Sequence, residues 1–196
     1  NNDLENKLGF KKEEFKLGGV LILFNNLLQS LFKSQILTIG SVIILLFLMF
    51  LVLFRSIKTS LIALLPNVIS IALVLGFMGW FKIPLDMMTI TIAAISMGIA
   101  VDNTIHYIYR FRSEVFKDFN YVKAMQRTHK SIGYAMYYTS ITIIVGFSIL
   151  IFSNFIPSIY FGLLTGLAMF FALLASLTLL PQLLIVFKPY GIVRKN

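Results

Sequence analysis

The segment SMGIAVDNTIHYIYRFR, residues 96–112, is the most informative stretch of this sequence. It continues an apolar run that begins near Met87, yet it contains Asp102 and, one helical turn later, His106. A carboxylate at the centre of a membrane-spanning helix costs about 2.5–3.5 kcal/mol on insertion scales. Only a partner, a water-filled cavity or a proton makes that cost tolerable. We therefore interpret Asp102 as a site that gains and loses a proton or ion within the membrane.

Composition independently indicates a membrane protein. The chain is 58% hydrophobic and 13% charged, with a mean hydropathy of +0.88, whereas soluble domains are about 25% charged. The net charge of +9 comes from basic residues beside the apolar runs, which fits membrane topology better than a nucleic-acid partner. The absence of cysteine excludes disulfides, thiolate zinc sites and cysteine nucleophiles.

The sequence predicts an all-α fold with five membrane-spanning helices. Each of five apolar segments has roughly the 20-residue length that a bilayer requires; they lie at about 36–54, 61–80, 88–109, 132–153 and 159–187. The preceding segment, 17–35, is too short and too polar to be a sixth span. It suits either an interfacial helix or the end of a soluble domain.

The distribution of basic residues predicts the orientation. Segment 110–130 contains six lysines and arginines, and the C-terminal tail is also basic, whereas the loops on the opposite side contain little charge. The positive-inside bias places 110–130 and the C-terminus in the cytoplasm and the N-terminus outside a cell (inner) membrane. We expect 113–130 to be a surface helix, with these aromatic residues toward lipid: Phe116, Phe119 and Tyr121. Arg110 and Arg112 then act as topology anchors, and His129 is expected to be solvated.

Helical spacing places a set of residues on the same face as Asp102: Thr91, Ala94, Ile95, Gly98, Asp102, His106 and Tyr109. A proton could pass between the cytoplasm and Asp102 by way of His106. The next span carries a matching stripe of small and hydroxylated residues: Ser131, Ala135, Thr139, Thr142 and Gly146. We expect Thr139 or Thr142 to face Asp102.

Each of these residues also has a structural interpretation. Asp102 could make only a hydrogen bond to the next span, and His106 could lie among lipid headgroups. Asn103 could join the polar cluster or support packing. The two threonines suit helix packing better than proton relay. We expect four glycines to allow close helix approach: Gly98, Gly146 and the GxxxG pair Gly162 and Gly166.

Enzyme signatures are missing from the sequence. It contains no HExxH, GxSxG or phosphate-loop motif and no paired histidines for a metal. An aspartyl intramembrane protease needs two carboxylates that share a proton, and neither Asp86 nor Glu114 is placed to pair with Asp102. The prediction is a protein that is not an enzyme and that requires no cofactor or metal.

At GIAVDNTIHYIYRFR the sequence resembles the resistance-nodulation-division superfamily, and most closely its MMPL branch of lipid-type exporters. That branch has a GxxxD[DY]xxxH-like stretch in the fourth helix of each six-helix half, which reads here as Gly98, Asp102, Asn103 and His106. Further stretches agree over about residues 18–188: LFRSIKTSLIALLPN, IPLDMMTITIAAISMGIAVDNTIH, YYTSITIIVGFSIL and SLTLLPQLL.

The resemblance implies that the five spans are helices eight to twelve of a twelve-helix exporter. Residues 1–35 would then be the end of an extracytoplasmic porter domain plus an interfacial helix, residues 36–190 the membrane domain and residues 191–196 a cytoplasmic tail. Asp102 would be the proton relay, with Thr139 and Thr142 as its partners. Many relatives have a second acid or a tyrosine where Asn103 stands, which leaves the proton stoichiometry open.

The function implied is the C-terminal membrane half of an exporter of hydrophobic or lipid-like molecules, driven by the proton-motive force. Its partners would be protons, the substrate, membrane lipids, and the missing N-terminal half with its porter domain. Two alternatives share the helical plan. One is a sterol-sensing-like module that binds lipid without pumping, and the other is a SecD/SecF-like accessory of protein export.

Overall fold

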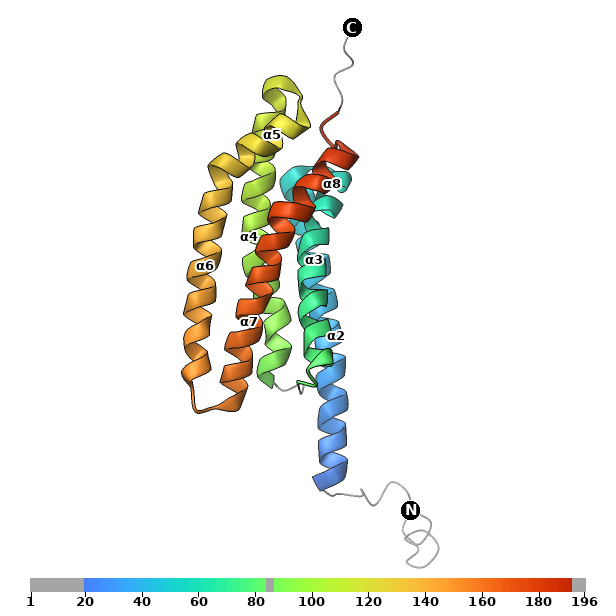
Figure 1. The fold of residues 1–196 in the computed structure, drawn as a ribbon. Helices are drawn as coiled ribbons and strands as arrows, with labels where there is room; N and C mark the ends of the chain where they lie inside the picture. Colours follow the sequence, from blue (N-terminus) through green and yellow to red (C-terminus); the bar gives the residue numbers. More distant parts are fainter. Residues whose placement is uncertain (1–19, 84–86, 192–196) are drawn as a thin grey trace, which may run out of the picture.

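A computed structural model describes residues 20–83 and 87–191, and all of its regular structure is helical. Five helical rods run side by side (Figure 1). The first three are α2 (Val20–Phe54), α3 (Ile57–Trp80) and α4 (Met87–Asp118). The fourth rod joins α5 (Tyr121–Thr128), η1 (His129–Gly133), α6 (Tyr134–Ser148) and η2 (Ile149–Phe152), and the fifth joins α7 (Ile156–Leu174), η3 (Ala175–Leu179) and α8 (Leu180–Phe187). The predicted all-α class is confirmed.

Four of these rods are long and apolar enough to cross a membrane: Leu23–Phe54, Ile57–Trp80, Tyr121–Phe152 and Ile156–Phe187. Within the described residues, helix α4 is not one of these four. It nevertheless lies inside the bundle, where it packs against α3 and α7. The structure therefore supports four of the five predicted spans by length and composition alone.

Helix α2 differs from the expectation for residues 17–35. It runs without a break from Val20 to Phe54, so residues 20–35 do not form a separate interfacial helix. The segment from 20 to 35 has no glycine or proline to interrupt the helix. At 1.5 Å per residue, α2 is about 52 Å long, which exceeds the roughly 30 Å hydrocarbon core. Its first turns therefore continue the axis of the first rod beyond the other helices (Figure 1).

The basic segments gather at one end of the bundle. The α2–α3 turn, the α4–α5 corner and the end of α8 lie together at the top of Figure 1, and the other interhelical connections lie at the opposite end. Arg55, Arg112 and Lys188 therefore share one end, which we call the basic end. This segregation is the one that the sequence predicted.

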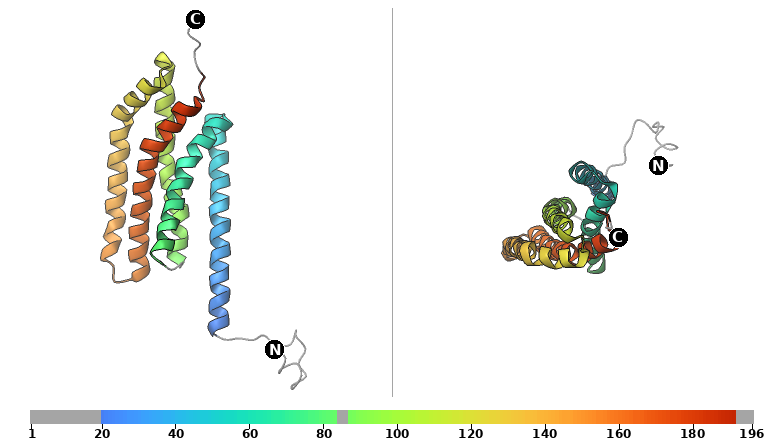
Figure 2. Two further views of the ribbon diagram at one scale, coloured as in Figure 1. Left: turned by 45° about the vertical axis from the view of Figure 1, so that its right-hand side comes forward. Right: turned by 90° about the horizontal axis from the view of Figure 1, so that it is seen from above.

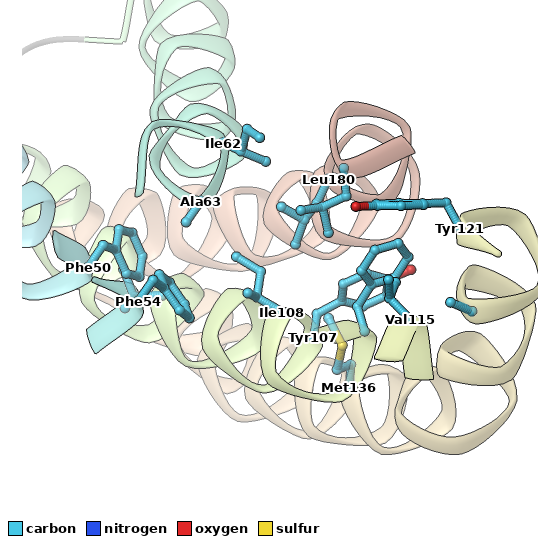
Figure 3. Packing of buried hydrophobic residues seen from close by; sticks show 14 of the residues in the cluster. Phe50, Phe54, Ile62, Ala63, Tyr107, Ile108, Val115, Tyr121, Met136 and Leu180 are labelled. Atoms are coloured by element: carbon cyan, nitrogen blue, oxygen red, sulfur yellow. The ribbon is translucent and has the colours of Figure 1, made fainter. Parts of the chain in front are cut away.

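Helix α7 is the central packing element, because it contacts α3, α4 and α6 (Figure 2). The largest apolar cluster lies toward the basic end and unites residues of all five rods, among them Phe50, Ile62, Ile108, Met136 and Leu180 (Figure 3). A buried hydrogen bond also joins two rods, since the Asn67 amide nitrogen of α3 donates to the Thr104 hydroxyl of α4 at 3.1 Å.

The segment 113–130 is not a single surface helix. Helix α4 continues to Asp118, and Asn120 then caps the short helix α5 by accepting a hydrogen bond from the Lys123 N–H at 3.1 Å. Phe116 and Phe119 are exposed, as expected. Tyr121 is buried in the main cluster (Figure 3), which contradicts its predicted place toward lipid. Its hydroxyl is held by the backbone at Tyr190 and Gly191, which the local sequence does not reveal.

The four glycines occupy different surroundings. A Cβ atom at Gly162 would lie 2.5 Å from the Phe147 carbonyl oxygen, so the contact of α7 with α6 requires glycine there. A Cβ atom at Gly166 would meet Ile144 at an ordinary 3.9 Å, and one at Gly98 or Gly146 would have nothing within 4 Å.

We predict that Gly162→Ala destabilises the bundle, by about 1–3 kcal/mol as is typical of overpacking. The added methyl group would press on backbone, which cannot rotate away. Thermal unfolding in detergent would measure the change. Gly146→Ala is the matched control and should leave the midpoint unchanged or slightly raised, since alanine favours helix. Equal midpoints for the two variants would contradict the close approach at Gly162.

Candidate functional site

The candidate site lies on the outward face of α4. Most of the residues that the sequence placed on one face are exposed, namely Thr91, Ile95, Gly98, Asp102, His106 and Tyr109, and Ala94 is partly buried. The opposite face, which includes Met97, Val101 and Ile108, is buried against the other helices. The polar residues of α4 therefore point away from the chain's own core.

Asp102 and His106 contact each other on this face. The His106 Nε2 atom lies 3.3 Å from the Asp102 Oδ1 atom, across one helical turn. The side chains are 65% and 73% exposed for His106 and Asp102, respectively. The contact is an ion pair when the imidazole is protonated and a hydrogen bond when it is neutral. A carboxylate and an imidazole so close can exchange a proton directly.

The link between α4 and α6 differs from the one expected. The Asn103 amide nitrogen donates to the Ser140 hydroxyl at 3.2 Å, and Ser140 is buried. Thr139 and Thr142 are exposed, and their hydroxyls donate to carbonyls of their own helix, at Ala135 and Tyr138. Among the described residues, therefore, the side chain that α6 offers to this part of α4 is Ser140, one position from the predicted stripe.

No group of three or more histidine, cysteine or acidic side chains in the described part of the chain could hold a metal ion. The polar chemistry at this face is therefore that of one carboxylate, one imidazole and one amide. These groups suit proton exchange and hydrogen bonding.

A second polar cluster lies at the α4–α5 corner of the basic end, beyond the apolar part of α4. Glu114 is only 1% exposed and pairs with three cations. Its carboxylate oxygens lie 3.0 Å from Arg110, 2.7 Å from Lys117 and 2.7 Å from Arg127. Arg127 also donates to both oxygens of Asp118, at 2.9 and 3.0 Å. The sequence analysis considered Glu114 only as a possible partner of Asp102 and Arg110 only as a topology anchor, so this network was missed.

The cations around Glu114 change its ionisation. The hydrogen bond from Lys117 is the main cause that lowers the Glu114 pKa below its ordinary 4.5, and Arg127 and Arg110 lower it further. Arg127 and the Asn120 backbone likewise lower the Asp118 pKa. Both carboxylates therefore stay charged at neutral pH and fasten α5 to the end of α4.

His129, expected to be solvated, instead joins the fourth rod to the fifth. Its Nε2 atom lies 3.0 Å from the Leu177 carbonyl oxygen and 3.4 Å from the Tyr107 hydroxyl. In an α-helix the N–H of residue 181 would donate to that carbonyl, but residue 181 is proline and has no N–H. The imidazole therefore supplies a donor to a carbonyl oxygen that Pro181 cannot serve. In the sequence, the four-residue spacing from Leu177 to Pro181 indicates that the Leu177 carbonyl needs another donor. It does not identify which distant side chain provides that donor.

Comparison with known proteins agrees with the fold, since it also indicates a multi-pass membrane protein. The model of the MMPL family matches residues 12–195. The chain thus belongs to the MMPL family, a branch of the resistance-nodulation-division superfamily of membrane transporters.

Three relatives are similar to most of the chain. The membrane protein MJ1562 of Methanocaldococcus jannaschii is 32% identical over 76% of this chain and 38% of its own length. The hopanoid transporter HpnN of Burkholderia multivorans is 32% identical over 70% of this chain and 15% of its own length. The apo-petrobactin exporter of Bacillus anthracis is 26% identical over 79% of this chain and 21% of its own length. The chain thus spans well under half the length of these relatives.

We predict that Glu114→Gln lowers thermal stability at pH 7, because three cations would lose their shared anion. Since the folded-state pKa of Glu114 lies below its ordinary 4.5, its charge adds stability above about that pH. The contribution disappears as the pH falls through the lowered folded-state value. The difference in melting temperature between the native protein and the variant should therefore shrink below about pH 4.5.

Asp102→Asn is the control, since it removes an exposed carboxylate from the same helix. An exposed pair contributes about 0–1 kcal/mol, so this variant should melt within a few degrees of the native protein. A Glu114→Gln variant as stable as the native protein at pH 7 would contradict the conclusion that this network fastens α5 to the end of α4.

We predict that His129→Ala destabilises the chain by about 0.5–1.5 kcal/mol, the net contribution of a hydrogen bond, because the partly buried Leu177 carbonyl would lose this donor. The cost should shrink when Pro181→Ala is also present, because that change restores the backbone N–H to Leu177. A double-mutant cycle of unfolding free energies measures this coupling. His129→Gln, which retains a donor on a long side chain, should lose less than His129→Ala. Strictly additive effects of His129→Ala and Pro181→Ala would disprove the interaction.

Proposed function

We propose that this chain is the C-terminal membrane half of an exporter driven by the proton-motive force, in which Asp102 carries the proton. The observation that supports the proposal best is the Asp102–His106 pair, 3.3 Å apart on the outward face of α4. Exposed to lipid, this carboxylate would incur the insertion cost of about 2.5–3.5 kcal/mol. A second membrane half packed against this face would remove the pair from lipid and enclose it in a polar site.

The open space at Gly98 supports the same arrangement. A Cβ atom added at Gly98, one turn from Asp102, would have no other atom of the chain within 4 Å. Small residues let another helix approach closely, and transporters of this kind place their sites between two pseudo-symmetric halves. The relatives extend far beyond the matched region, so they have the length to supply such a half. Thr139 and Thr142 would then line the enclosed site, with Asn103 fixed by Ser140.

The orientation of the chain follows from the positive-inside bias. The basic end would face the cytoplasm, and the long N-terminal part of α2 would reach outward from the membrane. His106 lies one turn closer than Asp102 to the basic end and would pass protons between the cytoplasm and the carboxylate.

Protonation would drive transport by changing the charge of Asp102. A proton that crosses about 100 mV releases roughly 2.3 kcal/mol. Neutral Asp102 would no longer hold His106 by an ion pair, and α4 could repack against the other half. The proton thereby shifts a two-state equilibrium between conformations. Export of hydrophobic or lipid-like molecules fits the membrane setting and the name of the hopanoid transporter among the relatives.

The principal alternative is a sterol-sensing-like module that binds lipid without pumping. It predicts lipid binding that does not respond to protonation of Asp102. Two of the relatives are named as a transporter and an exporter, which favours transport over sensing, and over a SecD/SecF-like accessory of protein export.

We predict that Asp102→Asn abolishes proton-coupled export by the whole transporter, because an amide cannot take up and release the proton. Substrate efflux and the accompanying proton flux, measured in vesicles with an imposed pH gradient, test this. His106→Gln should slow export without abolishing it. Asp118→Asn, which removes an acid at the α4–α5 corner, is the control and should retain most of the activity. Unchanged export by the Asp102→Asn variant would refute the relay.

A further inference from the structure

A hollow at the basic end, between the fourth and fifth rods, has no part in the proposed proton path. It has a volume of about 450 Å³, and its lining includes His129, Lys130, Tyr134, Tyr137, Tyr138 and Leu177. Two π-helical segments border it, η1 at His129–Gly133 and η3 at Ala175–Leu179. Segments of π-helix inside α-helices frequently mark functional sites.

The walls of the hollow are held at a fixed distance. The 3.0 Å contact between His129 and the Leu177 carbonyl oxygen ties η1 to η3 at its base. Gly133 contributes no side chain to fill the space. Two helix irregularities and one hydrogen bond therefore hold the two rods in place around the hollow, and exposed side chains of the fourth rod form its rim.

The rim of the hollow is both cationic and aromatic. Lys130 is exposed and makes no ion pair within residues 20–83 and 87–191. Tyr134, Tyr137 and Tyr138 are 67%, 48% and 66% exposed. Tyrosines near basic residues at the end of a span are typical of the level of lipid headgroups. Their hydroxyls can donate to an anion while their rings contact hydrocarbon.

The hollow lies on a different side of α6 from Thr139. Tyr137 precedes Thr139 by two residues and so points about 160° away from it around the helix. Ser140, which contacts Asn103, lies between the two directions. A partner half that covers Thr139 would thus leave Tyr137 facing lipid, whereas Tyr138, one helical turn from Thr142, would lie at the edge of the covered face.

We propose that this hollow binds the headgroup of an anionic phospholipid from the leaflet on the basic side. Lys130 and the hydroxyls of Tyr134 and Tyr137 hold the phosphate, and an acyl chain runs along Tyr138 and Leu177. The lipid rests on both π-segments and so fastens the cytoplasmic end of α6 to the fifth rod. The site is independent of the proton relay and would remain if Asp102 proved to be structural.

The test uses the full chain in phosphatidylcholine nanodiscs that contain a minor fraction of spin-labelled phosphatidylglycerol. Electron paramagnetic resonance reports the motionally restricted lipid. Lys130→Gln should weaken phosphatidylglycerol binding about fivefold, the effect of one lysine at an anionic surface. Tyr134→Phe combined with Tyr137→Phe should weaken it further, whereas spin-labelled phosphatidylcholine should respond to none of these changes.

Lys123→Gln is the matched control, because Lys123 is an exposed lysine of the same rod outside the hollow. It should leave phosphatidylglycerol binding unchanged while circular dichroism shows all variants folded. Equal loss in the Lys130 and Lys123 variants would mean diffuse attraction and overturn the site. Displacement of the lipid by inorganic phosphate would mean a site for free anions, and protection of Lys130 from lipid in the whole transporter would mean a protein contact. Either result also overturns the proposal.

Discussion

The requirement that backbone hydrogen bonds be satisfied away from water is the constraint on which this structure depends. In an apolar environment a helix satisfies this requirement, because each backbone N–H pairs with a carbonyl of the same helix. This explains why the described chain consists of five nearly continuous rods. Where a proline removes a donor, another group must compensate. At Pro181 that group is His129, from a different rod, so a local defect in one helix becomes a tertiary contact between two.

The same need to pair polar groups away from water explains the contrast between the two polar clusters. Glu114 is buried, but three cations surround it within the chain, so its charge is neutralised locally at the basic end. Among residues 20–83 and 87–191, the ion-pair partner of Asp102 is His106, and both side chains face outward. The chain thus satisfies its structural acid by itself and leaves the other acid on an open face, where the proposed second membrane half would cover it.

Helix α7 decides how these features are arranged. It contacts α3, α4 and α6 at once, and at Gly162 it approaches the backbone of the preceding rod so closely that a side chain would not fit. As a consequence α4 and α6 meet through Asn103 and Ser140 instead of through a threonine stripe. The hollow at Lys130 arises at the other end of the same contact, where the fourth and fifth rods both change to π-helix.

The sequence by itself determined the all-α class, the approximate rods, the segregation of basic residues to one end and the residues that share a face with Asp102. These features follow from hydropathy and from the 3.6-residue period, which act over neighbouring residues. Only the tertiary structure decided that this face points outward, that Ser140 meets Asn103, and that Tyr121, Glu114 and His129 are bound by partners. Those outcomes depend on which helices become neighbours, and the partners lie 13, 37, 48 or 70 residues away along the chain. No local pattern specifies contacts at such separations, because they arise from the shape of the packed rods.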